Sequence, residues 1–221
     1  MKTRIAASIL NADFGRLADE IAMCVDGGAD MIHLDVMDGR FVPNITFGEK
    51  MITEVRKLTT LPLDVHMMVE EPERYFDSFA GAGANGLTIH VEVAPHLQRQ
   101  LATIRKLGCA AGAAVNPGTS LATVREVIGD LDVLLVMTVN PGFGGQKFIP
   151  TSPDKVARAR HLLTEGRSHA ALEVDGGISR ETIAAAWRAG ADTFVVGHAI
   201  FAAADPRAEF AALRSICMET V

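Results

Sequence analysis

Acidic and imidazole side chains alternate with apolar ones along two short segments of the chain. His33 and Asp35 stand two residues apart in the first segment, and Asp64 and His66 stand two apart in the second. Side chains two apart share one face of a β-strand, so neighbouring strands would bring His33, Asp35 and His66 together. Asp175 ends a later apolar run and would complete a set of two imidazoles and two carboxylates. Such a set suits a divalent transition metal, although a lone His–Asp pair is more often a structural hydrogen bond.

Glycine clusters form a second group of candidate binding residues. The clusters are Gly142-Phe143-Gly144-Gly145, then Gly176-Gly177, then Gly197 beside His198. Glycine lets backbone N–H groups approach a ligand closely, and phosphate in barrel enzymes is frequently bound by the loops after strands seven and eight. For any one of these glycines taken alone, a role in a turn is the better explanation. Three clusters after three successive apolar segments together indicate a phosphate site.

Polar residues end nearly every apolar segment that could be a strand. In chain order they are Ser8, His33 with Asp35, His66, His90, Asn116, Asn140, Asp175 and Gly197-His198. Met37, Met68 and Met137 recur near these ends, where core packing and lining of a pocket are equally good interpretations. A rim with only a structural role would not require this succession of polar groups.

The elements that must position these residues alternate regularly. Gly28-Ala29-Asp30, Gly83-Ala84-Asn85 and Gly190-Ala191-Asp192 each stand between a helical-looking segment and an apolar run. Glycine closes a helix in the left-handed conformation, and the apolar run suits a buried strand. Three copies of one helix-to-strand junction indicate many alternating βα units.

Hydrophobic periodicity predicts eight strands, each followed by a helix. The strands are expected near Ile5–Leu10, Met31–Val36, Leu63–Met68, Gly86–His90, Ala110–Val115, Val133–Val139, Ala171–Val174 and Thr193–Val196. The helices are expected near Arg16–Gly27, Glu49–Leu58, Pro72–Ala82, Pro95–Leu107, Ser120–Ile128, Pro153–Glu165, Arg180–Ala189 and Pro206–Met218. We therefore predict an α/β fold, a (β/α)8 TIM barrel forming a single catalytic domain over residues 1–221. The alternative, a doubly wound open sheet, would require a G-x-G-x-x-G fingerprint, and the glycine spacing after Asn140 differs from it.

Composition limits the classes of function. The chain has 221 residues, 48% hydrophobic residues and a formal charge of −6, which fits one soluble domain. We expect no nucleic-acid partner, because no run of five or more Lys/Arg residues occurs, and no membrane span or signal peptide, because the apolar stretches are short. Cys24, Cys109 and Cys217 lie far apart without a C-x-x-C pair, which predicts reduced thiols in a cytoplasmic protein.

Five segments together resemble the ribulose-phosphate 3-epimerase family, and the resemblance runs from about Ile5 to Pro206. They are Ser8 to Phe14 (SILNADF), His33 to Gly39 (HLDVMDG), Asp64 to Met68 (DVHMM), Met137 to Gln146 (MTVNPGFGGQ) and Glu173 to Gly177 (EVDGG). The resemblance implies a metal-dependent isomerase of the pentose phosphate pathway and the Calvin cycle. It would interconvert D-ribulose 5-phosphate and D-xylulose 5-phosphate through a cis-enediolate.

The resemblance also implies roles for individual residues. His33, Asp35, His66 and Asp175 would hold one divalent ion (Zn²⁺, Fe²⁺, Mn²⁺ or Co²⁺), with Asp35 and Asp175 also the proton acceptor and donor. Ser8 and His66 would contact the substrate, and Gly142 to Gly145, Gly176-Gly177 and Gly197-His198 would hold its phosphate. The family usually has a small residue such as Ser where this chain has His198. We expect His198 to contribute its backbone N–H and an imidazolium.

Other functions stay open at this point. A 3-epimerase of a six-carbon ketose phosphate, such as D-allulose 6-phosphate, would differ only in pocket length. A phosphate-binding lyase or decarboxylase would want a lysine at a strand end, and none of the eight predicted ends carries one. A non-catalytic phosphate-binding protein gives no reason for two Asp and two His on one rim. The expected partner is a small sugar phosphate, and the resemblance suggests a homo-oligomer.

Overall fold

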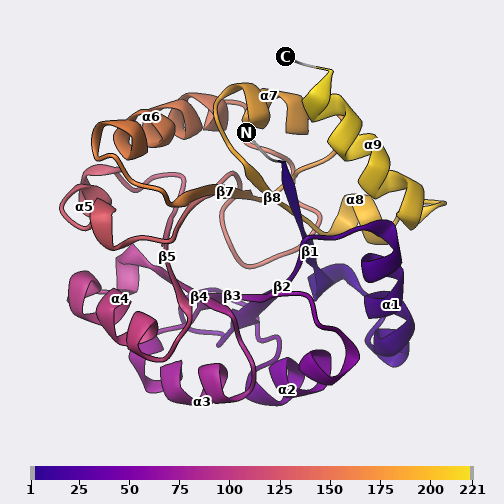
Figure 1. The fold of residues 1–221 in the computed structure, drawn as a ribbon, viewed down its shortest axis with the longest axis horizontal. Coiled ribbons are helices and arrows are strands. Elements are labelled where there is room, and N and C mark those ends of the chain that lie inside the picture. The colour runs from indigo at the N-terminus through magenta and orange to yellow at the C-terminus, as the bar shows by residue number, and fades with distance from the viewer. Residues whose placement is uncertain (1–2, 220–221) are drawn as a thin grey trace.

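Eight parallel strands close into a barrel surrounded by helices in the computed structural model, which describes residues 3–219 (Figure 1). The strands are β1 (Arg4–Ser8), β2 (Met31–Met37), β3 (Leu63–Met68), β4 (Gly86–His90), β5 (Ala110–Val115), β6 (Val133–Met137), β7 (Ala171–Asp175) and β8 (Thr193–Val196). They pair in chain order, and β8 pairs with β1 to close the ring. The predicted (β/α)8 barrel is confirmed.

Helices follow the strands and cover the outside of the barrel. They are α1 (Leu17–Gly27), α2 (Glu49–Leu58), α3 (Phe76–Gly81), α4 (Leu97–Lys106), α5 (Ala122–Arg125), α6 (Ser152–Glu165), α7 (Ile183–Arg188), α8 (His198–Phe201) and α9 (Pro206–Met218). Short 3-10 turns add η1 (Ile9–Asn11), η2 (Phe14–Arg16), η3 (Pro72–Arg74), η4 (Val91–Val93) and η5 (Ile128–Asp130). Among residues 3–219, no helix has the length and apolar character needed to cross a bilayer.

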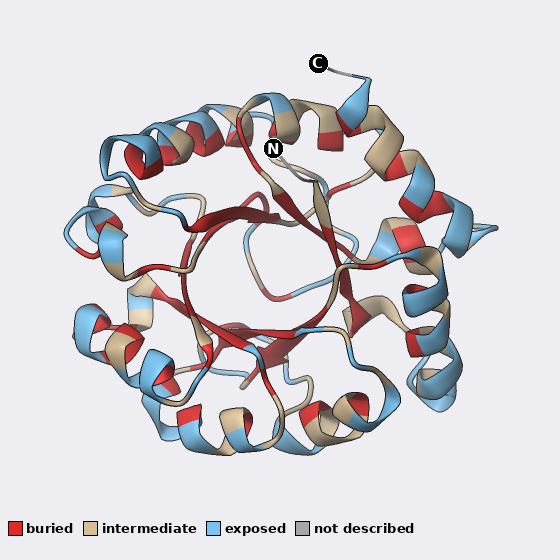
Figure 2. Cartoon of the chain, in the orientation of Figure 1, coloured by how far each residue is buried: buried red, intermediate tan, exposed pale blue. Residues whose placement is uncertain are grey.

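Alternation along each strand divides the side chains between two environments. On β2, Ile32, Leu34 and Val36 belong to the large apolar core between barrel and helices. His33 and Asp35 are also buried, but they point into the barrel. Buried residues accordingly occupy the strands on both faces and only the inward stripe of each helix (Figure 2). The interior polar groups thus lie on rigid strands with packed neighbours on every side.

The repeated helix-to-strand junction has a structural role at the amino-terminal end of the barrel. The Asp30 carboxylate accepts a hydrogen bond from the Ile5 N–H at 2.8 Å, and the Asn85 amide oxygen accepts one from the Leu63 N–H at 2.8 Å. Asp192 does the same for the N–H of Leu172. The motif therefore ties the first residues of one strand to the junction preceding the next. Asp132 repeats the contact with Ala111 in a segment whose sequence lacks the motif.

Differences from the predicted elements lie at strand ends, at helix ends and in one missed helix. The strands predicted near Ile5–Leu10 and Val133–Val139 end earlier, at Ser8 and Met137, and Ile9 and Leu10 belong to η1, where the Ser8 hydroxyl accepts a hydrogen bond from the Leu10 N–H. The expected helix from Pro72 to Ala82 is divided into η3 and α3, because Glu71 takes a left-handed conformation just before Pro72 and Tyr75 interrupts the helix between them. The expected helices after β5 and β7 are also shorter, as α5 and α7. The short helix α8 was not predicted, since four residues cannot display a helical period. It begins at His198, directly after β8.

Candidate active site

A pocket of about 400 Å³ opens at the carboxyl ends of the strands. This volume lies within the roughly 300–1,000 Å³ typical of small-molecule sites. Its lining includes most of the predicted site residues: Ser8, Asp35, Met37, Met68, Met137, Gly142, Phe143, Gly144, Gly145, Asp175, Gly176, Gly177, Gly197 and His198. The strand ends and the glycine loops therefore surround one cavity.

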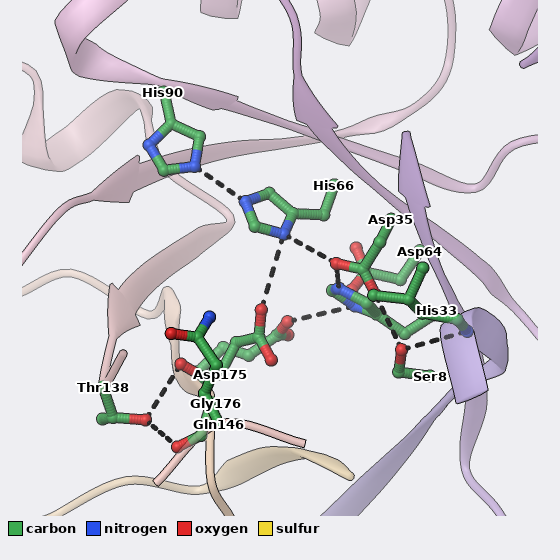
Figure 3. A network of polar contacts seen from close by, with 12 residues as sticks. Ser8, His33, Asp35, Asp64, His66, His90, Thr138, Gln146, Asp175 and Gly176 are labelled. Carbon is green, nitrogen blue, oxygen red and sulfur yellow. Dashed lines mark hydrogen bonds and ion pairs between the residues drawn. The ribbon is translucent and has the colours of Figure 1, made fainter. Parts of the chain in front are cut away.

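Two imidazoles and two carboxylates meet at the base of this pocket (Figure 3). Asp35 Oδ1 lies 3.4 Å from His33 Nε2 and 3.2 Å from His66 Nδ1, and Asp175 Oδ2 lies 3.6 Å from His66 Nδ1. One donor atom from each of the four residues lies within 4.8 Å of the other three. Donor atoms around a tetrahedral ion with bonds of ~2.0–2.1 Å are separated by roughly 3.3–3.5 Å. The spacing of the four side chains fits a divalent cation.

One buried ring nitrogen supports this interpretation. His33 Nδ1 lies 2.7 Å from Asp64 Oδ2, so its proton points to that carboxylate. The opposite nitrogen, Nε2, is buried without a hydrogen-bond partner and faces Asp35 Oδ1 at 3.4 Å. A lone pair facing a carboxylate is unfavourable unless a proton or metal ion lies between them. Asp64 therefore orients the His33 ring so that Nε2 faces Asp35, where a proton or a cation would satisfy it.

Buried charges in this region shift one another's pKa values. Burial opposes the charged form of His33, but Asp35 and Asp64 outweigh it and raise the His33 pKa well above its ordinary value. Burial likewise opposes ionisation of Asp35, yet its pKa is lowered because His33 and His66 stabilise the carboxylate. Burial together with the Asp64 charge raises the pKa of Glu173 well above normal. The cluster holds a protonated Glu173 below an ionised Asp35.

Neighbouring hydroxyls position the two pocket carboxylates. Ser8 Oγ donates to Asp35 Oδ2 at 2.6 Å, which leaves Oδ1 directed at the imidazoles. Thr138 Oγ1 donates to the Asp175 carbonyl at 2.9 Å and to the Gly176 carbonyl at 2.5 Å, where β7 ends. Burial and then repulsion from Asp35 raise the pKa of Asp175 to about 7. In the metal-free protein the pKa values of the two carboxylates are therefore shifted in opposite directions, with that of Asp35 lowered and that of Asp175 raised.

A row of hydrogen bonds leads from His66 away from the pocket. His66 Nε2 lies 2.8 Å from His90 Nε2, and His90 Nδ1 lies 3.1 Å from Glu92 Oε2. Burial lowers the pKa of His90 to about 4, so that ring is neutral. Burial opposes ionisation of Glu92, but hydrogen bonds from His90, Thr119 and the Asn116 N–H lower its pKa to about 2. His66 and His90 are fully buried and lie outside the pocket lining.

The glycine loops come together around one asparagine. A β-carbon on Gly144 or on Gly197 would lie 2.7 Å from Asn11 Oδ1, so a larger residue at either position would require the Asn11 side chain to move. Gly177 has a φ of +66°, and a β-carbon there would overlap the backbone of Phe148. Glycine at these positions allows three loops to approach one another closely. These loops form the glycine-rich end of the pocket.

Gln146 and Phe143, in the loop after β6, have side chains in different environments. The Gln146 side-chain amide donates to the carbonyls of Asn140 at 2.6 Å and Phe143 at 3.0 Å, which holds the loop in a tight turn. Phe143 itself is 56% exposed at the pocket mouth. His198 lies across the loop, with its ring 3.8 Å from where a β-carbon on Gly145 would be. The structure places His198 at the glycine end of the pocket, as the sequence predicted.

Some residues of the site were not predicted. Asp64 was recognised as pointing inward, but its contact with His33 depends on the register of two strands that only the fold supplies. The Asn11 side chain packs against Gly144 and Gly197, and the Thr138 hydroxyl contacts two backbone carbonyls; neither contact has a sequence signature. The pocket also includes Lys147, an exposed loop residue and the only lysine in the lining of the described pocket, which is not at a strand end.

Comparisons with known proteins agree on one family. A profile of the ribulose-phosphate 3 epimerase family matches residues 4–201. The ribulose-phosphate 3-epimerase of Bacillus subtilis is 46% identical over 212 residues, covering 96% of this chain and 98% of the relative. The protein of the same name from Aquifex aeolicus is 43% identical over 217 residues, covering 98% of each.

Solved structures with lower identity share the fold. The 3-hexulose-6-phosphate synthase of Salmonella typhimurium superposes with a TM-score of 0.73 at 19% identity, covering 99% of this chain and all of the other. The thiamine phosphate pyrophosphorylase of Pyrococcus furiosus gives a TM-score of 0.67 at 17% identity, covering 100% of this chain and 96% of the other. These similarities establish the barrel architecture and leave the chemistry to the site itself.

Proposed function

Because the chain belongs to the ribulose-phosphate 3-epimerase family, we propose that it interconverts D-ribulose 5-phosphate and D-xylulose 5-phosphate. The observation that carries this proposal is the pair of carboxylates, Asp35 and Asp175, whose pKa values are shifted in opposite directions at the base of a pocket with glycine loops at one end. Inversion at a carbon next to a ketone removes a proton from one face and returns one to the other. Two carboxyl groups on different strands suit this task.

Asp35 is the proton acceptor in one direction, and Asp175 is the proton donor. Asp35 is ionised, because His33 and His66 stabilise its charge, and Ser8 restrains it. Asp175 lies across the barrel on β7, and in the metal-free protein burial and the Asp35 charge raise its pKa to about 7, whereas a bound cation would favour its ionised form. The reverse reaction exchanges the roles. A pKa near the working pH is the condition under which a general acid is most effective.

His33, Asp35, His66 and Asp175 would hold one divalent cation. The unpartnered His33 Nε2 and the donor spacing support this assignment, and two imidazoles with two carboxylates suit Zn²⁺, Fe²⁺, Mn²⁺ or Co²⁺. Such an ion supplies positive charge next to the negative charge that develops on the substrate as its C3 proton leaves. Asp64 keeps His33 in the tautomer that leaves Nε2 free for the ion.

The substrate phosphate would bind at the glycine end of the pocket. Gly142 to Gly145, Gly176-Gly177 and Gly197 line the pocket there and would offer backbone N–H groups, and His198 would add its N–H and an imidazolium. Ser8 lies on the pocket wall and would contact the sugar, whereas His66 is buried behind Asp35. Met37, Met68 and Met137 form an apolar wall beside the carboxylates. Their side chains would exclude water and strengthen the electrostatic interactions at C3.

The test is turnover of the metal-loaded enzyme with purified substrates. We expect D-xylulose 5-phosphate to form from D-ribulose 5-phosphate, and we expect both Asp35→Asn and Asp175→Asn to lose at least about 100-fold in kcat/KM. D-Allulose 6-phosphate is the comparison substrate. Faster epimerisation of the six-carbon sugar would transfer the assignment to that substrate. Full activity in either variant would refute the two-carboxylate mechanism.

A further inference from the structure

The row His66, His90 and Glu92 is not explained by substrate binding, because His66 and His90 are buried and lie outside the pocket lining. Figure 3 shows the contact between the two rings. Its atoms nevertheless have defined hydrogen-bonding roles. Glu92 Oε1 accepts from the Asn116 N–H at 2.9 Å and from the Thr119 hydroxyl, and its Oε2 faces His90 Nδ1 at 3.1 Å. An ionised carboxylate can only accept. The proton between them therefore belongs to His90 Nδ1.

The protons of both rings follow from this first assignment. A neutral imidazole with its proton on Nδ1 has a lone pair on Nε2. His90 Nε2 must then accept from the nitrogen that faces it at 2.8 Å, which is His66 Nε2. With a cation bound between His66 Nδ1 and Asp35, His66 then has its proton on Nε2 and a lone pair on Nδ1. That lone pair points to Asp35 and Asp175, where a cation would be bound. Without a cation, Asp35 Oδ1 at 3.2 Å accepts a hydrogen bond from Nδ1 and competes with this tautomer.

We propose that Glu92 is a positioning residue, which acts through His90 to hold His66 in the tautomer able to bind the metal ion. This inference rests on the proposed metal site and extends it to a carboxylate that is connected to the ion only through His90 and His66. The arrangement parallels the direct contact of Asp64 with His33, so each metal-binding imidazole would have its own orienting carboxylate. The difference is that Glu92 acts across a second ring.

The surroundings of Glu92 show why its position is well defined. Its two donors come from the turn after β5, and Lys155 of α6 ties that turn down. The buried Lys155 ammonium donates to the carbonyls of Asn116, Pro117 and Thr119. All three of its protons are therefore used on one turn. A fixed turn gives a fixed carboxylate, and hence a fixed direction for the hydrogen bonds that lead to His66.

The substitution Glu92→Gln keeps the size of the side chain but reverses the direction of the hydrogen bonds that lead through His90 to His66. The Asn116 N–H can only donate, so the Gln oxygen must take the place of Oε1. The Gln amide NH₂ then faces His90 Nδ1 and forces a lone pair onto that atom. His90 would move its proton to Nε2 and donate to His66, which in turn would be protonated on Nδ1. A protonated Nδ1 cannot bind a metal ion.

Two matched variants separate this effect from general disturbance. Thr119→Val removes one donor to Glu92 but leaves an acceptor-only carboxylate facing His90. Glu126→Gln removes a negative charge from an exposed position at the end of α5. Neither change reverses a hydrogen bond in the row. A merely structural role for Glu92 would predict that Thr119→Val and Glu92→Gln act alike.

The experiment measures Zn²⁺ affinity of chelator-treated protein by competition with a chromophoric chelator. We expect Glu92→Gln to bind Zn²⁺ roughly 10–100-fold more weakly than the wild-type protein, with Thr119→Val and Glu126→Gln within about twofold of it. In the Zn²⁺-loaded wild-type protein, ¹⁵N NMR should show His90 protonated on Nδ1 and unprotonated on Nε2. This second measurement needs no variant to fold.

The outcomes distinguish the two proposals. Zn²⁺ binding by the wild-type protein with unchanged affinity in Glu92→Gln, or a His90 proton on Nε2, would overturn the positioning role alone. Equal weakening in Thr119→Val would also overturn it, since that variant keeps the tautomer. A wild-type protein that binds no Zn²⁺, Mn²⁺ or Co²⁺ would refute the metal site itself, and the positioning role with it.

Discussion

The raised pKa of Asp175 predicts that a change which removes activity will stabilise the metal-free protein. Asp175 has a pKa of about 7 in the folded chain against an ordinary value of 3.8, because it is buried and close to Asp35. Between these two pH values the folded protein keeps a proton that the unfolded chain has released. The contribution of Asp175 to the free energy of unfolding must therefore fall as the pH rises from 4 to 8.

The size of this loss can be worked out from the two pKa values. A difference of about three pH units corresponds to ~4 kcal/mol when Asp175 is fully ionised in both states. Of this, ~2–3 kcal/mol is lost between pH 5 and pH 8. The neutral amide introduced by Asp175→Asn has no such proton to lose. The quantity to compare is the free energy of unfolding of Asp175→Asn minus that of the wild-type protein. We expect this difference to be ~2–3 kcal/mol larger at pH 8 than at pH 5.

Equilibrium unfolding in urea with EDTA present measures this difference. The m-value should be the same for both proteins at each pH, so that the midpoint reports stability directly. Titration of groups remote from Asp175 is common to the two proteins and cancels in the comparison, whereas Asp35 is coupled to Asp175 and contributes to the measured difference. A difference in unfolding free energy that stays constant between pH 5 and pH 8, or shrinks, would refute the assigned pKa and with it the explanation of how Asp175 holds its proton.

Three further predictions concern the metal, the glycine loops and the turn after β5. Chelator treatment should abolish turnover and lower the thermal midpoint, and Zn²⁺ or Mn²⁺ should restore both; turnover that survives chelation would exclude a required metal. Gly177→Ala should lower kcat/KM about 10-fold or more, because alanine there has a strained φ and clashes with the Phe148 backbone. The control Gly118→Ala, at a position with open space around it, should leave kcat/KM unchanged. Lys155→Met should reduce the free energy of unfolding by about 1–3 kcal/mol, because three carbonyls lose a charged donor, and an unchanged urea midpoint would contradict this.

The alternation of side chains on the strands made much of the site predictable. Once His33 and Asp35 are placed on a strand, a period of two directs both into the barrel, and the same holds for His66 on the next strand. Neighbouring strands in a closed barrel bring such residues together whatever the loops do. Asp175 could be added because barrel sites lie at the carboxyl ends of the strands.

The unpredicted parts depend on relations between distant segments. The contact of Asp64 with His33 requires the register in which β2 pairs with β3, and sequence alone leaves that register open. Glu92 lies in a 3-10 turn just after β4, and its importance depends on which rings stack beyond it. The helix α8 is too short to have a period, although it places His198 at the pocket. Local patterns predicted the directions of side chains, and packing decided their partners.

Deuterium incorporation at C3 tests the central claim most directly. The metal-loaded enzyme is incubated with D-ribulose 5-phosphate in D₂O, and the C3 proton is followed by NMR as D-xylulose 5-phosphate forms. A two-carboxylate epimerase should place solvent deuterium at C3 of the xylulose product, and Asp35→Asn and Asp175→Asn should each lose product formation. Product formed without deuterium at C3, or formed at the normal rate by either variant, would contradict proton transfer by Asp35 and Asp175.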